Sequence, residues 1–266
     1  MREYAVNAKP RIAVHKFSSC DGCQLAFLNL GEELLELAQR VDIVHFAEAG
    51  AVDPEAPVDI AFVEGSISTP DEQARIQTVR ANSRMLVTIG ACATSGGLQA
   101  LRNHADSAEW MARVYAHPEY IETLSTATPI AAHVRVDFEL WGCPVSSTQI
   151  VAAVRALLFG VTPVPDGDKV CLDCKRQHNV CVLVAHGEPC LGPVTRTGCG
   201  ALCPRFGRDC YGCYGPSDNP NADSLGARLR GLGLVPDAVA RRFRFIHSAQ
   251  PALAEAARRA LGEDHE

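Results

Sequence analysis

Eight of the twelve cysteines in this chain lie within residues 171–216, and this stretch constrains the fold more than any other feature. Glycine and proline separate the cysteines, and no apolar run there is long enough to build a hydrophobic core. Disulfides, zinc ions or iron–sulfur clusters must therefore hold the stretch together. The eight form two sets of four: Cys171, Cys174, Cys181 and Cys190, then Cys199, Cys203, Cys210 and Cys213.

The start of the chain bears on the choice between disulfides and metal. Residues 1–14 contain neither the apolar segment of a secretion signal nor a twin-arginine motif, so we expect a cytoplasmic protein. A reducing cytosol disfavours a disulfide framework. No run approaches the ~18 apolar residues of a membrane span. The net charge of −6 gives no basic surface for nucleic acid. Metal or cluster ligation is therefore the main hypothesis for the cysteines.

The first 163 residues alternate short β-rich runs with helical patterns, as βαβ units do. We expect strands over 11–17, 41–46, 58–63 and 85–89, and a last one from 132–136 towards Trp141. Helices are expected over 21–39, 70–82 and 146–159, with another near Leu98. This order predicts an α/β fold with a doubly wound, flavodoxin-like parallel sheet.

A domain boundary is expected where Pro163, Pro165 and Gly167 interrupt the periodic pattern. We assign 1–163 to the flavodoxin-like domain. Residues 164–266 form an irregular cysteine-rich lobe that ends in helices over 222–232 and 249–261.

The other four cysteines each follow a predicted strand: Cys20 and Cys23 the first, Cys92 the fourth and Cys143 the last. Because parallel strand ends meet at one rim of a sheet, these thiols are expected to surround one metal centre. Glycines flank all of them, which lets backbone approach a bulky group. A single such cysteine would more often be a small buried core residue. Four at strand ends favour a shared site.

The motifs CDGC, GACATSGG, GCP and CLGPVTRTGC, with the later CYGCYGP, resemble the small subunit of nickel–iron hydrogenases. The resemblance covers residues 11 to 216 and is strongest to the cytoplasmic delta subunit of NAD(P)-linked hydrogenase, the sulfhydrogenase type. It implies three 4Fe–4S clusters. A proximal cluster would use Cys20, Cys23, Cys92 and Cys143, a medial cluster Cys199, Cys203, Cys210 and Cys213, and a distal cluster Cys171, Cys174, Cys181 and Cys190.

The resemblance also implies a function and partners. The chain would carry electrons between the nickel–iron centre of a large subunit and a flavin subunit that reduces NAD(P)+, with an additional iron–sulfur subunit in the complex. The nickel–iron centre and FAD would lie on those partners, so this chain contributes no catalytic residue. No G-x-G-x-x-G fingerprint follows a strand, which agrees with the absence of a dinucleotide site here.

Three positions depart from membrane-bound or more distant relatives. Cys171 stands where the membrane-bound type has a histidine, and Cys203 stands where that type has a proline that leaves the medial cluster with three irons. Gln24 replaces a glutamate implicated in proton movement, which puts a carboxylate exit there in doubt. Glu64 ends the third strand; a plain strand-to-loop turn is one interpretation, and a role at the large-subunit face is the one the resemblance favours.

Other functions remain open at this point. Two zinc ions would hold residues 171–213 equally well, since zinc uses the same Cys₄ ligands and C-x₂-C spacing. The small subunit of an F420-reducing or F420-non-reducing hydrogenase is a close alternative. A related complex I subunit has an adjacent Cys-Cys pair and no eight-cysteine lobe, which counts against it. The electron acceptor is not encoded in this chain.

Overall fold

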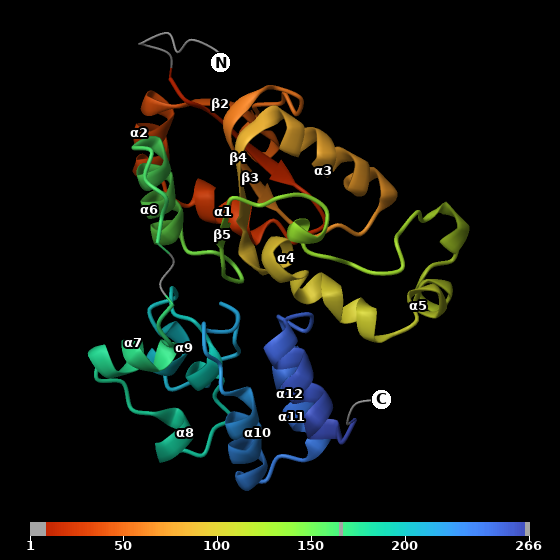
Figure 1. Ribbon diagram of the computed structural model, residues 1–266, viewed down its shortest axis with the longest axis vertical. Coiled ribbons are helices and arrows are strands. Elements are labelled where there is room, and N and C mark those ends of the chain that lie inside the picture. The colour runs from red at the N-terminus through yellow and green to blue at the C-terminus, as the bar shows by residue number, and fades with distance from the viewer. Residues whose placement is uncertain (1–8, 165–166, 264–266) are drawn as a thin grey trace.

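The computed structural model describes residues 9–164 and 167–263, and within them five strands form one parallel sheet (Figure 1). The strands are β1 (Arg11–Lys16), β2 (Asp42–Phe46), β3 (Val58–Glu64), β4 (Ser83–Ile89) and β5 (Phe138–Leu140). Their order is β2-β1-β3-β4-β5, and every neighbouring pair is parallel. The predicted α/β fold is confirmed, with the strand order of flavodoxin-like sheets.

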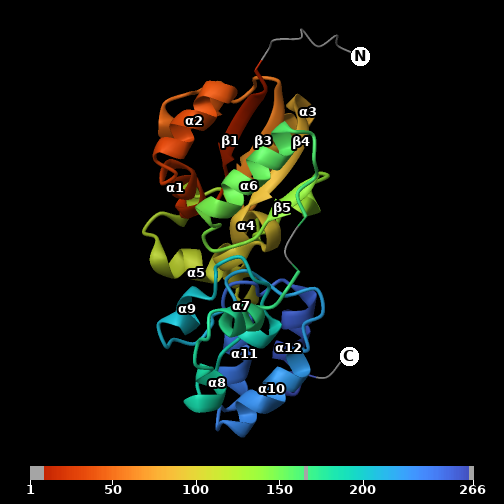
Figure 2. The same cartoon turned by 90° about the vertical axis from the view of Figure 1, so that its left-hand side faces the viewer.

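Helices cover both faces of the sheet (Figure 1, Figure 2). The helices α1 (Gly22–Leu28), α2 (Glu32–Arg40) and α6 (Ser147–Leu158) pack on one face, where Phe62 joins their core. The helix α3 (Pro70–Asn82) packs on the other face against Ala61 and Val63. Neighbouring residues of β3 thus point to opposite cores, as the period of a strand requires.

The remaining elements connect the sheet to the cysteine-rich stretch and the C-terminus. After β2 and β4 come η1 (Ala47–Ala49), α4 (Gly90–Ser95), η2 (Gly97–His104), α5 (Ser107–Val114), η3 (Pro118–Tyr120) and η4 (Ile130–Ala132). Beyond α6 come α7 (Val170–Arg176), α8 (Val182–Ala185), η5 (Gly192–Val194), α9 (Leu202–Arg205), α10 (Ala222–Gly231), α11 (Pro236–Arg244) and α12 (Pro251–Leu261). Figure 1 shows α10 to α12 at the end of the molecule far from the N-terminal strand.

Two predictions about elements need correction, and one helix was not predicted. The strand expected over 132–136 is not formed, because η4 occupies its start and pairing with β4 begins only at Asp137, whose amide donates to the Leu86 carbonyl at 2.9 Å. The helix expected over 21–39 is two helices, separated by a turn that buries Leu30. The helix α11 was not predicted. The domain division at 163/164 stays a prediction, and Pro165 lies outside the described residues.

Candidate functional site

The four outlying cysteines come together at the carboxyl rim of the sheet. Cys20 follows β1, Cys23 lies in the first turn of α1, Cys92 lies in α4, and Cys143 follows β5. Burial, together with the nearby Cys143 and Cys20 thiols, raises the pKa of Cys92 to about 12. Burial also raises the pKa of Cys23, and the Cys92 and Cys143 thiols add to it. These mutual effects require short distances, so the four thiols form one group.

Backbone approaches this group closely at Gly90. Its φ is 85°, a conformation that favours glycine, and a β-carbon added there would collide with the Cys23 sulfur. Glu64 supports the same loop, because its Oε1 accepts the Cys23 amide N–H at 3.0 Å. Glu64 is buried, and burial raises its pKa. The turn interpretation of Glu64 is therefore incomplete: the side chain holds the loop that carries Cys23.

The cysteines between 171 and 190 form a second group around α7 and α8. Burial, together with Cys190, Cys174 and Cys181, raises the pKa of Cys171 to about 11. Cys181 is exposed, whereas Cys190 is buried. The group therefore reaches the protein surface on the side of Cys181.

The cysteines between 199 and 213 form a third group around α9. Burial, together with the nearby thiols of Cys199, Cys143 and Cys203, raises the pKa of Cys213 to about 12. Burial also raises the pKa of Cys210, and the Gly212 amide donates to the Cys210 sulfur at 3.4 Å. Each set of four that the sequence suggested thus lies in one part of the structure, while the assignment of each set to one cluster stays a prediction.

The three groups are linked in series by hydrogen bonds. His247 links the rim group to the third group, because its ring contacts both the Ser95 hydroxyl, three residues after Cys92, and the Cys213 carbonyl. The Cys210 amide of the third group donates to the sulfur of Cys190 in the second group at 3.3 Å. The third group therefore lies between the other two, and N–H donors to sulfur are a common feature of cluster sites.

The chemistry of the three groups fits iron–sulfur ligation. Each set offers four thiols, the Gly90 backbone and the Cys23 sulfur approach each other closely, and amides donate to the sulfurs of Cys190 and Cys210. Within residues 9–164 and 167–263, no three His, Cys, Asp or Glu side chains lie close enough together to hold a single metal ion.

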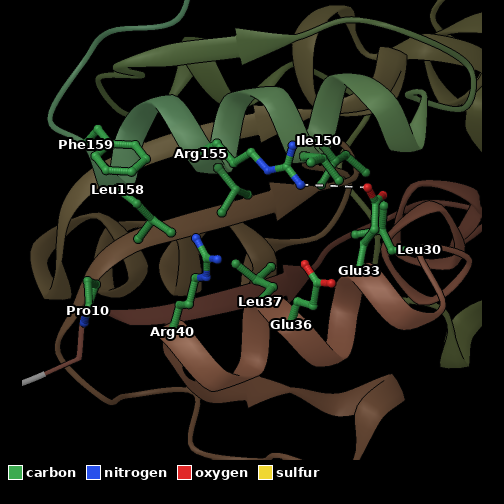
Figure 3. A pocket seen from close by; sticks show the side chains of 12 residues that line it. Pro10, Leu30, Glu33, Glu36, Leu37, Arg40, Ile150, Arg155, Leu158 and Phe159 are labelled. Carbon is green, nitrogen blue, oxygen red and sulfur yellow. Dashed lines mark ion pairs between the residues drawn. The ribbon is translucent and has the colours of Figure 1, made fainter.

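A cavity of about 370 Å³ lies elsewhere, between α2 and α6 (Figure 3). Its floor includes Leu37 and Ile150, and Glu33 faces Arg155 across it at 3.8 Å. None of the cysteines lines this cavity. It is therefore separate from the cysteine groups.

Sequence reasoning missed one residue at the cysteine groups, His247. It follows α11, is 1% exposed, and contacts Ser95 and the Cys213 carbonyl. Burial lowers its pKa to about 4. No motif surrounds it, and it lies far from every cysteine in the sequence. The sequence therefore contains no signal that could have identified it.

Comparisons with known proteins agree with this geometry. Residues 20–157 match the family described as the 20 kDa subunit of NADH ubiquinone oxidoreductase. The chain is 33% identical over 234 residues to the sulfhydrogenase 2 subunit delta of Pyrococcus furiosus, covering 88% of this chain and 98% of that one. The chain belongs to the hydrogenase small-subunit family. It is thus a subunit of an oxidoreductase.

This hydrogenase small subunit is also similar to subunits of two different types of hydrogenase. It is 31% identical over 271 residues to a subunit of the F420-non-reducing hydrogenase vhu of Methanocaldococcus jannaschii, covering 88% of this chain and 94% of that one. A chain in the crystal structure of an NAD+-reducing nickel–iron hydrogenase is 29% identical with a TM-score of 0.54, covering 59% of this chain and 94% of that one. In the part of the chain that the structure describes, no helix is long and apolar enough to cross a membrane.

Proposed function

We propose that this hydrogenase small subunit transfers electrons and binds three 4Fe–4S clusters. The proximal cluster would use the rim group, the medial cluster Cys199, Cys203, Cys210 and Cys213, and the distal cluster Cys171, Cys174, Cys181 and Cys190. The observation that carries the proposal is the serial order of the three cysteine groups: His247 links Ser95 to the Cys213 carbonyl, and the Cys210 amide donates to the Cys190 sulfur. Bound there, the clusters would accept and release electrons singly.

Residues of this chain control the protonation and charge of the thiols. Burial raises the pKa of most of the twelve thiols, including Cys92 and Cys213. Without metal these thiols are protonated at neutral pH, so ligation must release protons. Amide donors such as those of Cys210 and Gly212 then stabilise the negative charge on the sulfurs.

Zinc remains the alternative ligand on donor chemistry alone, since four thiols suit both metals. Two observations favour clusters. Glycine at position 90 lets backbone approach the Cys23 sulfur closely, and relatives along most of the chain are hydrogenase subunits. Cys203 would complete a four-iron medial cluster. Cys171 would make cysteine the ligand of the distal four-iron cluster at every position.

A large subunit carrying the nickel–iron centre is the proposed partner at the rim group. Cys20 is exposed while Cys23 is buried, so this group reaches the surface on one side. The solved relative is part of a nickel–iron hydrogenase, which supports such a partner. The reaction would be oxidation of H2 or reduction of protons on that partner, with this chain conducting the electrons.

The acceptor in this proposal is NAD(P)+, reduced by a flavin subunit with an additional iron–sulfur subunit. The name of the solved relative, an NAD+-reducing enzyme, supports it. The second candidate is an F420-non-reducing hydrogenase, which the similarity to the Methanocaldococcus jannaschii protein favours. Co-purified subunits distinguish them, because only the first requires a flavin subunit with a dinucleotide fingerprint. The cytoplasmic location stays a prediction from the sequence.

The test is metal analysis of the anaerobically purified complex. We expect about 12 iron atoms and as many sulfides on this chain, four for each cluster. A colourless protein with about three zinc ions would overturn the cluster assignment.

Two cysteine variants extend this test to the order of the clusters. Cys92→Ser should remove iron from the rim group and abolish reduction of both artificial dyes and NAD(P)+ by H2. Cys181→Ser makes the same chemical change at the proposed distal cluster and should abolish only the reduction of NAD(P)+. Equal effects of the two variants on dye reduction would contradict the serial order.

A further inference from the structure

His247 lies between α11 and α12 and touches three segments that carry cysteines. Its Nδ1 lies 2.7 Å from the Ser95 hydroxyl at the end of α4, and its Nε2 lies 3.0 Å from the Cys213 carbonyl oxygen. Its ring lies beside Trp141, with 5.5 Å between centroids, two residues before Cys143. A single buried imidazole therefore connects the rim group with the third group.

The hydrogen bonds of His247 fix which nitrogen carries the proton. The Cys213 carbonyl can only accept, so Nε2 is the donor. In the neutral ring Nδ1 is then an acceptor, and the Ser95 hydroxyl proton is shared between it and the Ala91 carbonyl, 2.9 Å away. Both ring nitrogens are satisfied inside the protein, as a buried polar side chain requires.

The surroundings of His247 leave little room for movement. Gly215 has a φ of 75°, and a β-carbon there would collide with the Trp141 ring and lie 3.4 Å from Cε1 of His247. The Arg196 guanidinium lies 4.6 Å above the Trp141 ring, and its Nε donates to the Pro216 carbonyl at 3.0 Å. The His247 imidazole is therefore closely surrounded where the rim group and the third group meet.

His247 joins the backbone of the third group to a segment of the rim group. The Cys213 carbonyl accepts the Nε2 proton, and Nδ1 contacts Ser95, three residues after Cys92. We propose that His247 is a positioning residue that fixes the medial cysteines against the proximal ones, and so sets the distance between the two clusters. This inference rests on the proposed function, because it concerns how far apart two bound clusters lie.

The experiment compares three substitutions in the complex with the large subunit, fully reduced under anaerobic conditions. The measurement is the electron paramagnetic resonance splitting that arises when neighbouring reduced clusters interact. His247→Gln can place an N–H where Nε2 lies, so it should retain the splitting. His247→Asn reaches only the Nδ1 position, and His247→Ala reaches neither, so both should lose it. His186→Ala, an exposed histidine in the cysteine-rich stretch, is the control and should match the wild type.

The iron content of each variant separates misplacement of clusters from their loss. If the Ala variant loses iron, the test is the comparison of the Gln and Asn variants. Equal splitting in those two variants would overturn the proposal. Wild-type splitting in the Ala variant at full iron content also overturns it. A wild-type complex without any iron–sulfur signal would instead overturn the proposed function, and this inference with it.

Discussion

The sheet and the cysteine-rich stretch are stabilised by different means. The sheet buries Phe27, Phe46 and Phe62 in a core between strands and helices. In the cysteine-rich stretch, Val170, Val182, Cys190, Ala201 and Cys210 form a small cluster, and Leu191, Val194 and Tyr214 are also buried. Because buried apolar area provides most of the stability of a fold, the first region can form without metal and the second is expected to depend on it.

This difference also separates the three cysteine groups. The rim group is attached to strand ends that the sheet has already positioned. The other two groups are attached to short helices, such as α8 (Val182–Ala185) and α9 (Leu202–Arg205), which are too short to be stable alone. Their ligands must therefore be positioned largely by the group that they bind.

The largest expected effect is that of removing iron, which should unfold one region and spare the other. Amides of the cysteine-rich stretch, such as Leu191 bonded to the Cys210 carbonyl, should exchange with deuterium at least about 100-fold faster, because the metal supplies much of their folding free energy. Amides of β3 and β4 should keep their protection. Hydrogen exchange followed by mass spectrometry measures both regions in one sample. Unchanged protection of Leu191 would mean that the small core and α10 to α12 are sufficient.

A substitution in the sheet core should instead destabilise the sheet. Phe62 is fully buried and meets the Phe27 ring edge-to-face at 5.2 Å, so Phe62→Ala should lower the free energy of unfolding by about 3–5 kcal/mol. Phe159→Ala is the matched control, since that ring is 80% exposed and should change stability by less than ~0.5 kcal/mol. Denaturant unfolding measures both, and similar losses would refute the importance of this core.

The same contrast explains what the sequence could predict. Thr69 and Pro70 form a local start signal, and α3 begins there as predicted, with a capping box between Thr69 and Glu72. The grouping of the rim cysteines followed from strand ends, which are also local features. His247 and the short β5 depend on contacts between distant residues, such as Ser95 with His247 and Asp137 with Leu86. Periodicity and motif spacing hold no information about such contacts.

The smallest expected effect concerns the charge of Glu64, which ends β3 beside the rim group. Its Oε1 accepts the Cys23 amide, whereas its Oε2 has no hydrogen-bond partner within the described part of the chain. Burial raises its pKa above the ordinary 4.5, although the Cys23 amide opposes this. The folded state therefore binds the proton more tightly than the unfolded state does. Ionised Glu64 destabilises the sheet above its raised pKa, and this cost disappears as the pH falls towards 4.5.

Glu64→Gln should accordingly stabilise the protein at pH 7 by about 1 kcal/mol and have no effect near pH 4, since its amide can still accept from Cys23 and can donate to the unpaired Oε1 of Gln24. Thermal unfolding across this pH range measures the difference. Glu109→Gln, an exposed carboxylate on α5, is the control and should change stability by less than ~0.5 kcal/mol at both pH values. A loss of stability in Glu64→Gln at pH 7 would mean that the negative charge itself holds the Cys23 loop. The rim group would then depend on this charge as well as on the sheet.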